Sequence, residues 1–154
     1  MNEFAIFAAG CFWGVDDTFR AIEGVSDVAV GYTGGHSNNP TYKDICGHGT
    51  GHAEAVRVEF DPAQVTFDEL LQVFFTSHDP TTMNRQGPDV GDQYRSAVFY
   101  TTPEQQVAAL AAIERCQPHF KRLIVTQVVP EATWYRAEEY HQQYHVKHGG
   151  GCKL

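Results

Sequence analysis

Near its start the chain reads Phe4-Ala5-Ile6-Phe7-Ala8-Ala9-Gly10-Cys11-Phe12-Trp13-Gly14. The apolar run at residues 4–9 is typical of a buried strand, and the residues after Gly14 follow a helical pattern. Glycines on both sides of Cys11 permit a tight turn. The stretch therefore predicts a strand, a turn and a helix, with Cys11 at or just before the first turn of that helix.

A cysteine at this position has two possible roles. Unpaired backbone N–H groups and the helix dipole favour negative charge at a helix N-terminus, where a thiol can have a pKa below its free value of about 8.5. Cys11 would then be a nucleophile, whereas the alternative is a small apolar side chain buried at the end of a strand. Phe12 and Trp13 favour the first role, because they could line a pocket for a methyl or thioether group, although core packing also explains them.

The bulk properties are those of a globular protein, and we expect residues 1–154 to form a single domain. Of its 154 residues, 42% are apolar and 19% are charged, and the net charge of −8 argues against a nucleic-acid partner. No apolar run approaches the roughly 20 residues that span a bilayer, and Met1-Asn2-Glu3 lacks the basic start of a secretory signal. We therefore expect a cytoplasmic protein with no membrane partner, whose cysteines are reactive or buried rather than joined in structural disulfides.

Periodicity and capping residues predict the remaining elements. Further strands are expected at Val25–Thr33, His52–Phe60, Ser96–Tyr100 and Leu123–Val129. Helices are expected to begin after the capping residues Thr66 and Thr102, and a short aromatic-rich helix is expected at Ala137–Tyr144. Two long polar loops, residues 34–51 and 78–94, are candidates for function. This order indicates an α+β fold, a two-layer α/β sandwich with a ferredoxin-like (split βαβ) plait at its core.

The alternation in the strand at His52–Phe60 shows which way its side chains point. Val56, Val58 and Phe60 share one face, and Glu54 has the same parity as these apolar residues. A carboxyl group that faces an apolar surface has its pKa raised by desolvation, so Glu54 could stay protonated near neutral pH and act as an acid. Alternatively, Glu54 lies at a wet end of the strand or pairs with a cation.

The end of the chain carries a second cysteine of interest. Three glycines precede Cys152, so we expect residues 147–154 to form a flexible tail that could bring this thiol to another sulfur. A frayed tail with an incidental cysteine is the alternative. Together, Cys11 and Cys152 suggest a redox cycle in which one cysteine is oxidised to a sulfenic acid and a resolving cysteine then forms a disulfide with it.

The sequence around Cys11 also carries a family resemblance. Gly10-Cys11-Phe12-Trp13-Gly14 resembles the signature of the A-type peptide methionine sulfoxide reductases. Further blocks that resemble this family, in the family's order, are Asn39-Pro40-Thr41-Tyr42, Thr50-Gly51-His52-Ala53-Glu54-Ala55-Val56, His78-Asp79-Pro80, Gln93-Tyr94-Arg95-Ser96 and Ala137-Glu138-Glu139-Tyr140-His141-Gln142-Gln143-Tyr144. The resemblance spans nearly the whole chain. It implies the same kind of fold and the reduction of the S epimer of methionine sulfoxide, free or in oxidised proteins, to methionine.

The resemblance also implies a role for individual residues. Cys11 would be the nucleophile, and Phe12 with Trp13 would enclose the methyl group of the substrate. Glu54 would be the acid, with Tyr42 and Tyr94 also donating to the sulfoxide oxygen. Asp89 would hold the hydrogen-bond geometry of the site, and Cys152 would be the single resolving cysteine.

Other implied properties concern cofactors and partners. The resemblance implies no metal and no bound cofactor, with thioredoxin or another dithiol as the reductant, and we expect a monomer. Cys46 matches a structural position of the family, and we expect Cys116 to lie in the core.

These residue types suit the implied chemistry. Attack of a thiolate on the sulfoxide sulfur places negative charge on the oxygen, which must be protonated before it can leave. A neutral carboxylic acid and phenol hydroxyls are suitable donors. The site must therefore hold an ionised thiol beside an un-ionised acid, and a helix N-terminus and an apolar strand face could separate the two pKa values in this way.

Three other functions compete with this hypothesis. Cys11, His52 and Glu54 could form the triad of an acyl transferase or hydrolase, but residues two apart on one strand share a face, which suits a triad poorly. Cys46 with His36, His48 and His52 could bind a metal, but the paired spacing of known sites is missing. A thioether-binding module without a reaction is the third hypothesis, and it predicts that Cys11→Ser retains all function.

Overall fold

The computed structural model describes residues 2–148 of the chain. The strands are β1 (Glu3–Ala9), β2 (Val25–Thr33), β3 (Ala53–Phe60), β4 (Arg85–Gln86), β5 (Asp89–Val90), β6 (Ser96–Tyr100), β7 (Gln127–Pro130) and β8 (Tyr135–Arg136). The α-helices are α1 (Phe12–Arg20), α2 (Tyr42–Cys46), α3 (Phe67–Thr76), α4 (Pro103–Cys116) and α5 (Tyr144–His148). Short 3-10 turns are η1 (Asp92–Tyr94), η2 (Gln117–His119) and η3 (Glu139–His141).

Six strands form one sheet in the order β7-β6-β1-β3-β2-β8. β3 lies between β1 and β2, and β1 lies between β3 and β6, with each neighbour antiparallel. The crossovers through α1 and α3 thus each connect two strands that are separated by a third, which is the split-βαβ arrangement. β7 adds to β6 in parallel at one edge, and β8 pairs with β2 at the other. The predicted α+β plait is confirmed.

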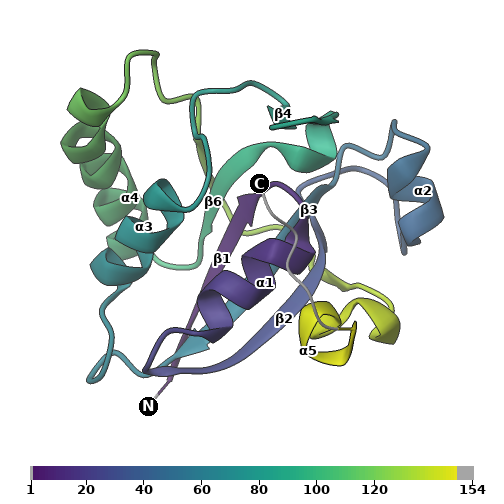
Figure 1. The fold of residues 1–154 in the computed structure, drawn as a ribbon, viewed down its shortest axis with the longest axis horizontal. Helices are drawn as coiled ribbons and strands as arrows, with labels where there is room; N and C mark the ends of the chain where they lie inside the picture. The colour runs from purple at the N-terminus through teal and green to yellow at the C-terminus, as the bar shows by residue number, and fades with distance from the viewer. Residues whose placement is uncertain (1, 149–154) are drawn as a thin grey trace.

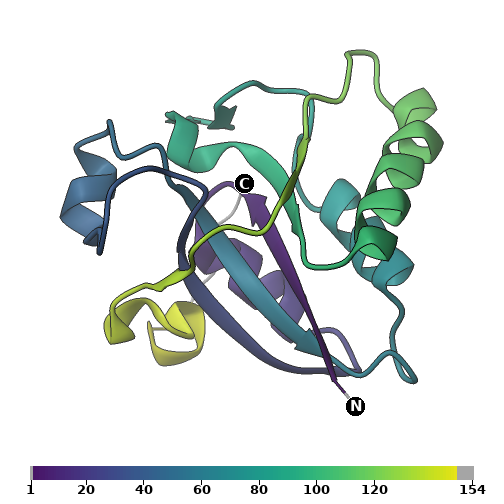
Figure 2. The same cartoon turned by 180° about the vertical axis from the view of Figure 1, so that it is seen from behind.

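The two faces of the sheet are covered differently. α1 lies across one face with α3 and α4 beside it (Figure 1), and the main core fills the space between these helices and the sheet. Here Phe7 stacks on Phe19 at a centroid distance of 4.9 Å and on Phe74 at 5.2 Å. Removal of such a ring typically costs about 3–5 kcal/mol of stability. The opposite face is crossed by the chain between α4 and β8 (Figure 2), whose Trp134 packs against a second, smaller cluster of buried residues that includes Ala55 and Phe99.

Two sequence predictions near the C-terminus are wrong. The predicted helix at Ala137–Tyr144 is instead η3 followed by α5, because Gln143 has a left-handed φ of 54° and the Gln142 side chain bonds to β2 at Val30. The predicted strand at Leu123–Val129 shortens to β7, since Val125 N–H donates to Pro80 O at 2.8 Å, away from the sheet. Residues 147 and 148 belong to α5, and the rest of the predicted tail, with Cys152, lies outside the described residues.

The two predicted long loops contain short ordered elements. α2 lies within the first loop and begins with a capping box between Thr41 and Asp44. The β4–β5 hairpin and η1 lie within the second loop. In Figure 1, α2 and the hairpin lie around the end of the sheet at which β1 leads into α1, and α5 lies next to α1 on the side of β2. Across residues 2–148, none of the helices has the length and apolar character that crossing a membrane requires.

Candidate active site

Cys11 is the N-cap of α1, as the sequence predicts. Gly10 before it has a φ of +96°, a conformation that side chains rarely adopt, and a Cβ placed there would lie 2.8 Å from the Gln86 side chain. Glycine is therefore required at residue 10 both by the backbone and by the approach of the β4–β5 hairpin. The dipole of the nine-residue helix favours negative charge at its N-terminus, where Cys11 lies.

Glu54 lies on the helix-covered face of the sheet, as the alternation in β3 predicts. Its residue is 2% exposed, and Phe12 N–H donates to its Oε1 at 3.2 Å. The pKa of Glu54 is raised to about 8, chiefly by burial; the Phe12 hydrogen bond limits this rise, and the nearby charge of Asp89 contributes to it. The carboxyl group directly behind Cys11 is therefore mostly protonated at pH 7.

Two tyrosine hydroxyls lie beside this carboxyl group. Burial is the largest cause that raises the pKa of Tyr94 to about 12, and the charges of Glu54, Asp89, Cys46 and Cys11 contribute to this rise. Burial also raises the pKa of Tyr42, whose hydroxyl is hydrogen-bonded to the thiol of Cys46 and feels the charge of Glu54. Both hydroxyls therefore keep their protons at neutral pH and can donate them in hydrogen bonds.

Aromatic rings of the C-terminal segment complete one wall of the site. Trp13 stacks on Tyr144 at a centroid distance of 4.0 Å, and its Nε1–H donates to His141 Nδ1 at 2.9 Å. His141 is fully buried, and burial lowers its pKa. Because Nδ1 accepts a hydrogen bond, the neutral ring carries its proton on Nε2, which has no partner among the described residues. The His141 ring also contacts Phe12 at 5.2 Å and Tyr42 at 4.4 Å.

A second carboxylate, Glu138, lies beneath this wall. Its Oε1 accepts from the Tyr32 hydroxyl and its Oε2 from Tyr42 N–H, both at 2.9 Å. Burial raises the pKa of Glu138, but hydrogen bonds from Tyr42 N–H, its own backbone and the Tyr32 hydroxyl, together with His141, outweigh burial, so that the pKa lies below its usual value. Tyr32 is fully buried and packs its ring 5.7 Å from Phe12.

The structure thus brings together all the predicted site residues that it describes: Cys11, Phe12, Trp13, Tyr42, Glu54, Asp89 and Tyr94. The sequence analysis missed Tyr32, Glu138 and His141, and it assigned Cys46 a structural role without placing its thiol against Tyr42. The sequence does contain a signal for α2, because Thr41 and Asp44 have the spacing of a capping box at a helix N-terminus. Cys116 is buried at the end of α4, in the core as expected.

The geometry does not support the triad or the metal site. His52 Nδ1 accepts from Gly35 N–H at 3.0 Å, and its Nε2 lies 2.7 Å from Ser37 O, so both ring nitrogens hold the loop before β3. Within residues 2–148, no three His, Cys, Asp or Glu side chains are arranged to hold a metal.

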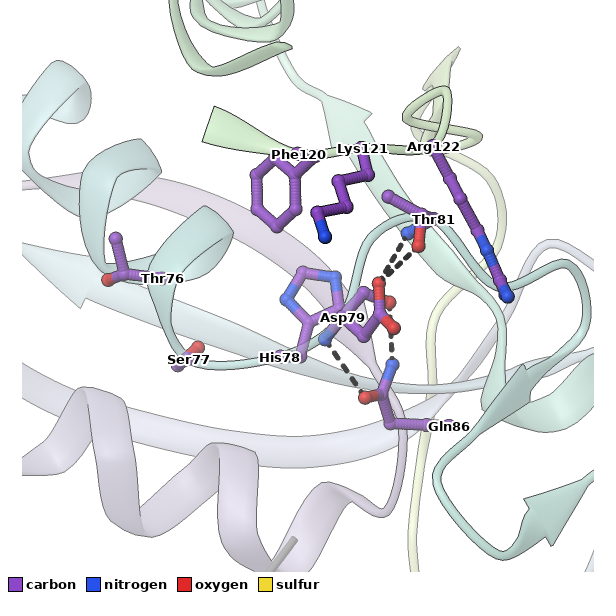
Figure 3. A pocket seen from close by; sticks show the side chains of 9 residues that line it. All are labelled: Thr76, Ser77, His78, Asp79, Thr81, Gln86, Phe120, Lys121 and Arg122. Atoms are coloured by element: carbon purple, nitrogen blue, oxygen red, sulfur yellow. Dashed lines mark hydrogen bonds between the residues drawn. The ribbon is translucent and has the colours of Figure 1, made fainter. Parts of the chain in front are cut away.

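A cavity of about 530 Å³ lies elsewhere on the molecule (Figure 3), between the end of α3 and the segment after α4. Lys121 and Arg122 are among its lining residues, and the Gln86 amide pairs there with the backbone of Asp79. None of the predicted site residues that the structure describes lines this cavity.

Comparison with known proteins gives consistent matches. A family model described as peptide methionine sulfoxide reductase matches residues 3–153. Relatives named peptide methionine sulfoxide reductase MsrA include one from Acidobacterium capsulatum, 58% identical over 94% of both chains. Another, from Methanosarcina acetivorans, is 57% identical over 96% of this chain and 79% of its own.

Solved structures agree with this fold. The methionine sulfoxide reductase A of Corynebacterium diphtheriae superposes with a TM-score of 0.94 at 38% identity, over 98% of this chain and 77% of that one. Mxr1 from Saccharomyces cerevisiae in complex with Trx2 superposes with a TM-score of 0.68 at 28% identity, over 93% of this chain and 84% of that one.

Proposed function

The chain belongs to the A-type peptide methionine sulfoxide reductases, oxidoreductases that reduce methionine sulfoxide, and we propose that it reduces the S epimer with Cys11 as nucleophile and Glu54 as acid. The observation that carries the proposal is the pairing of Cys11, at the start of α1, with a buried carboxyl group whose pKa is about 8. The helix dipole stabilises a thiolate, while burial keeps the acid neutral. The reaction needs an ionised nucleophile beside a neutral acid, and these two environments favour that combination.

In the first step, the Cys11 sulfur attacks the sulfur of the sulfoxide. The oxygen becomes negatively charged, and a proton from Glu54 together with hydrogen bonds from the Tyr42 and Tyr94 hydroxyls would stabilise it. Because Phe12 N–H donates to Glu54 Oε1, the proton of the acid is carried by the other oxygen. Overall, one thiol and one sulfoxide give the Cys11 sulfenic acid and one thioether.

The substrate's methyl group would lie against the aromatic wall. Phe12 is 1% exposed and packs into the floor, whereas Trp13 is partly exposed and fixed by its hydrogen bond to His141. The neutral thioether of the product also suits such a surface. Asp89, whose charge reaches Glu54 and Tyr94, would fix the polar side of the bound substrate.

In the second step, the thiol of Cys152 would attack the Cys11 sulfenic acid, releasing water and forming a disulfide. A dithiol reductant then exchanges with this disulfide and restores both thiols. We propose thioredoxin for this part, because the related Mxr1 has been solved in complex with Trx2.

Single-turnover chemistry tests the proposal. Pre-reduced protein without added reductant is mixed with S- or R-methionine sulfoxide, and methionine, free thiols and disulfides are then measured. We expect one methionine per chain from the S epimer, with Cys11 joined to Cys152. No product from either epimer, with every thiol retained, would overturn the proposal.

Two variants make the test sharper. Cys11→Ser should abolish the turnover, whereas the matched variant Cys116→Ser should leave it intact, since Cys116 lies in the core at the end of α4. If Cys11→Ser binds a thioether and loses no function, the result would instead support the hypothesis of a thioether-binding module without a reaction.

A further inference from the structure

The Glu138 side chain is shared between two tyrosines of the site. One carboxylate oxygen accepts from the Tyr32 hydroxyl, and the other accepts from the backbone N–H of Tyr42. These donors belong to β2 and α2, which lie far apart in the sequence from Glu138. The carboxylate therefore joins three segments of the chain at one point.

Tyr42 has need of such a contact. α2 has only five residues and lies in the long first loop, where Ile45 anchors it to the core. Its capping box uses Thr41 N–H and Asp44 N–H, each paired with the side chain of the other residue. Tyr42 N–H is left over at the first helical position, where it has no partner within the helix. Glu138 supplies that partner from outside.

The segment around Glu138 is already anchored without this side chain. Ala137 N–H donates to Val30 O at 3.0 Å. The Gln142 amide accepts from Val30 N–H and donates to Val30 O and Ala137 O, each at 2.9 Å. Because backbone and Gln142 contacts fix the segment against β2, the Glu138 carboxylate is not required to hold it there.

Tyr32 connects the carboxylate to the floor of the site. It is fully buried, packs on Phe12, and lies opposite Glu54 in the β2–β3 register. Through Glu138, the backbone of Tyr42 is therefore set relative to the strand pair that carries the acid.

We propose that Glu138 is a positioning residue, which holds Tyr42 so that its hydroxyl can reach the sulfoxide oxygen. The inference rests on the role proposed above for Tyr42. Since one N–H and one O–H donate to it, Glu138 is required as an acceptor and takes no part in proton transfer.

A double-mutant cycle on the rate of Cys11 oxidation tests the inference. Single-turnover rates at saturating S-methionine sulfoxide are measured for Tyr42→Phe, Glu138→Ala and the double variant. We expect each single change to slow the step about tenfold. Tyr42→Phe removes the hydroxyl that donates to the sulfoxide oxygen, and Glu138→Ala removes the acceptor that holds this hydroxyl in place. Tyr42→Phe keeps its backbone N–H, so in that background Glu138→Ala should cost less than about twofold.

A conservative variant and a neighbouring residue provide the controls. Glu138→Gln keeps one oxygen that can accept from Tyr42 N–H, so it should slow the step only about threefold. Glu139→Ala, at the exposed next residue, should retain the wild-type rate. If Glu138→Ala does not fold, Glu138→Gln replaces it in the same cycle.

Three outcomes would overturn the inference. A wild-type rate for Glu138→Ala, with Tyr42→Phe slowed, removes the role of Glu138 and leaves that of Tyr42 intact. Equal slowing by Glu138→Ala with and without the Tyr42 hydroxyl would show a general structural effect. A wild-type rate for Tyr42→Phe would contradict the role of Tyr42 itself, and the inference with it.

Discussion

The centre of the sheet and its edge each place one glutamate at the site, and they treat it in opposite ways. Glu54 lies in the middle of the sheet under α1, where burial raises its pKa to about 8. Glu138 lies next to the β8 edge, partly exposed, where hydrogen bonds from Tyr42 and Tyr32 lower its pKa despite some burial. The same side chain is therefore a neutral acid in one region and an ionised acceptor in the other.

The number of hydrogen-bond donors explains why the two pKa values shift in opposite directions. Glu54 receives one backbone N–H in an apolar environment, which does not offset the loss of water around a charge. Glu138 receives two donors and keeps part of its hydration. This difference fits the two proposed roles, because the proposed acid receives one donor and the proposed positioning residue receives two.

We expect the largest effect on the reaction rate from the substitution Glu54→Gln. The amide cannot transfer a proton, so formation of the Cys11 sulfenic acid should slow by about 10²–10⁴-fold at pH 8. Glu138→Gln should slow the same step only about threefold. Rapid-quench measurement of methionine in single turnover checks both. Near wild-type turnover by Glu54→Gln would refute its role as the acid.

The sequence predicts the centre of the sheet better than its edge, because the centre depends on contacts between residues that are close in the sequence. The alternation within β3 is a local pattern. It predicts the burial of Glu54 because every second residue of a strand lies on the same face, and Val56 and Val58 on that face are apolar. The place of Cys11 at the start of α1 is likewise encoded by Gly10 and the residues around it.

The edge region depends on contacts between distant segments. Glu138 contacts Tyr32 and Tyr42 only because β8 and the residues after it lie along β2. No pattern in the sequence predicts this pairing of distant segments. The left-handed φ of Gln143, which separates η3 from α5, is likewise not indicated by any local sequence pattern. The sequence therefore predicts the plait and the central acid, whereas the aromatic wall requires the structure.

The next largest effect concerns stability. The pKa of Glu54 is about 8 in the fold and 4.5 as its ordinary value. As pH rises from 4.5 toward 8, the unfolded chain ionises while the folded protein does not, so wild-type stability falls. Glu54→Gln has no such loss and should be more stable by about 3 kcal/mol at pH 7, but by less than about 1 kcal/mol at pH 5. Urea unfolding at both pH values measures this.

A second group and a control variant separate this effect from others. Burial lowers the pKa of His78 to about 4, so protonation of His78 in the unfolded chain reduces stability below pH 6.5. This loss is the same in wild type and in Glu54→Gln, so it cancels in their comparison. Glu59→Gln, on the same strand, should give no gain, because Glu59 is partly exposed and accepts from Asn2 and Ser26. Equal stability of Glu54→Gln and wild type at pH 7 would mean that burial of this carboxyl group is not costly.

The smallest effect is the pH dependence of the wild-type rate. Because the first step requires protonated Glu54, its rate should decline above pH 8 and approach a tenfold fall per pH unit. Glu138 is ionised throughout this range, since its pKa is lowered, so Glu138→Gln should shift the whole profile down without moving its midpoint. Single-turnover rates between pH 6 and 10 decide the matter. A midpoint that moves in Glu138→Gln would couple the two glutamates, and the edge of the sheet would then tune the acid as well as position the tyrosine.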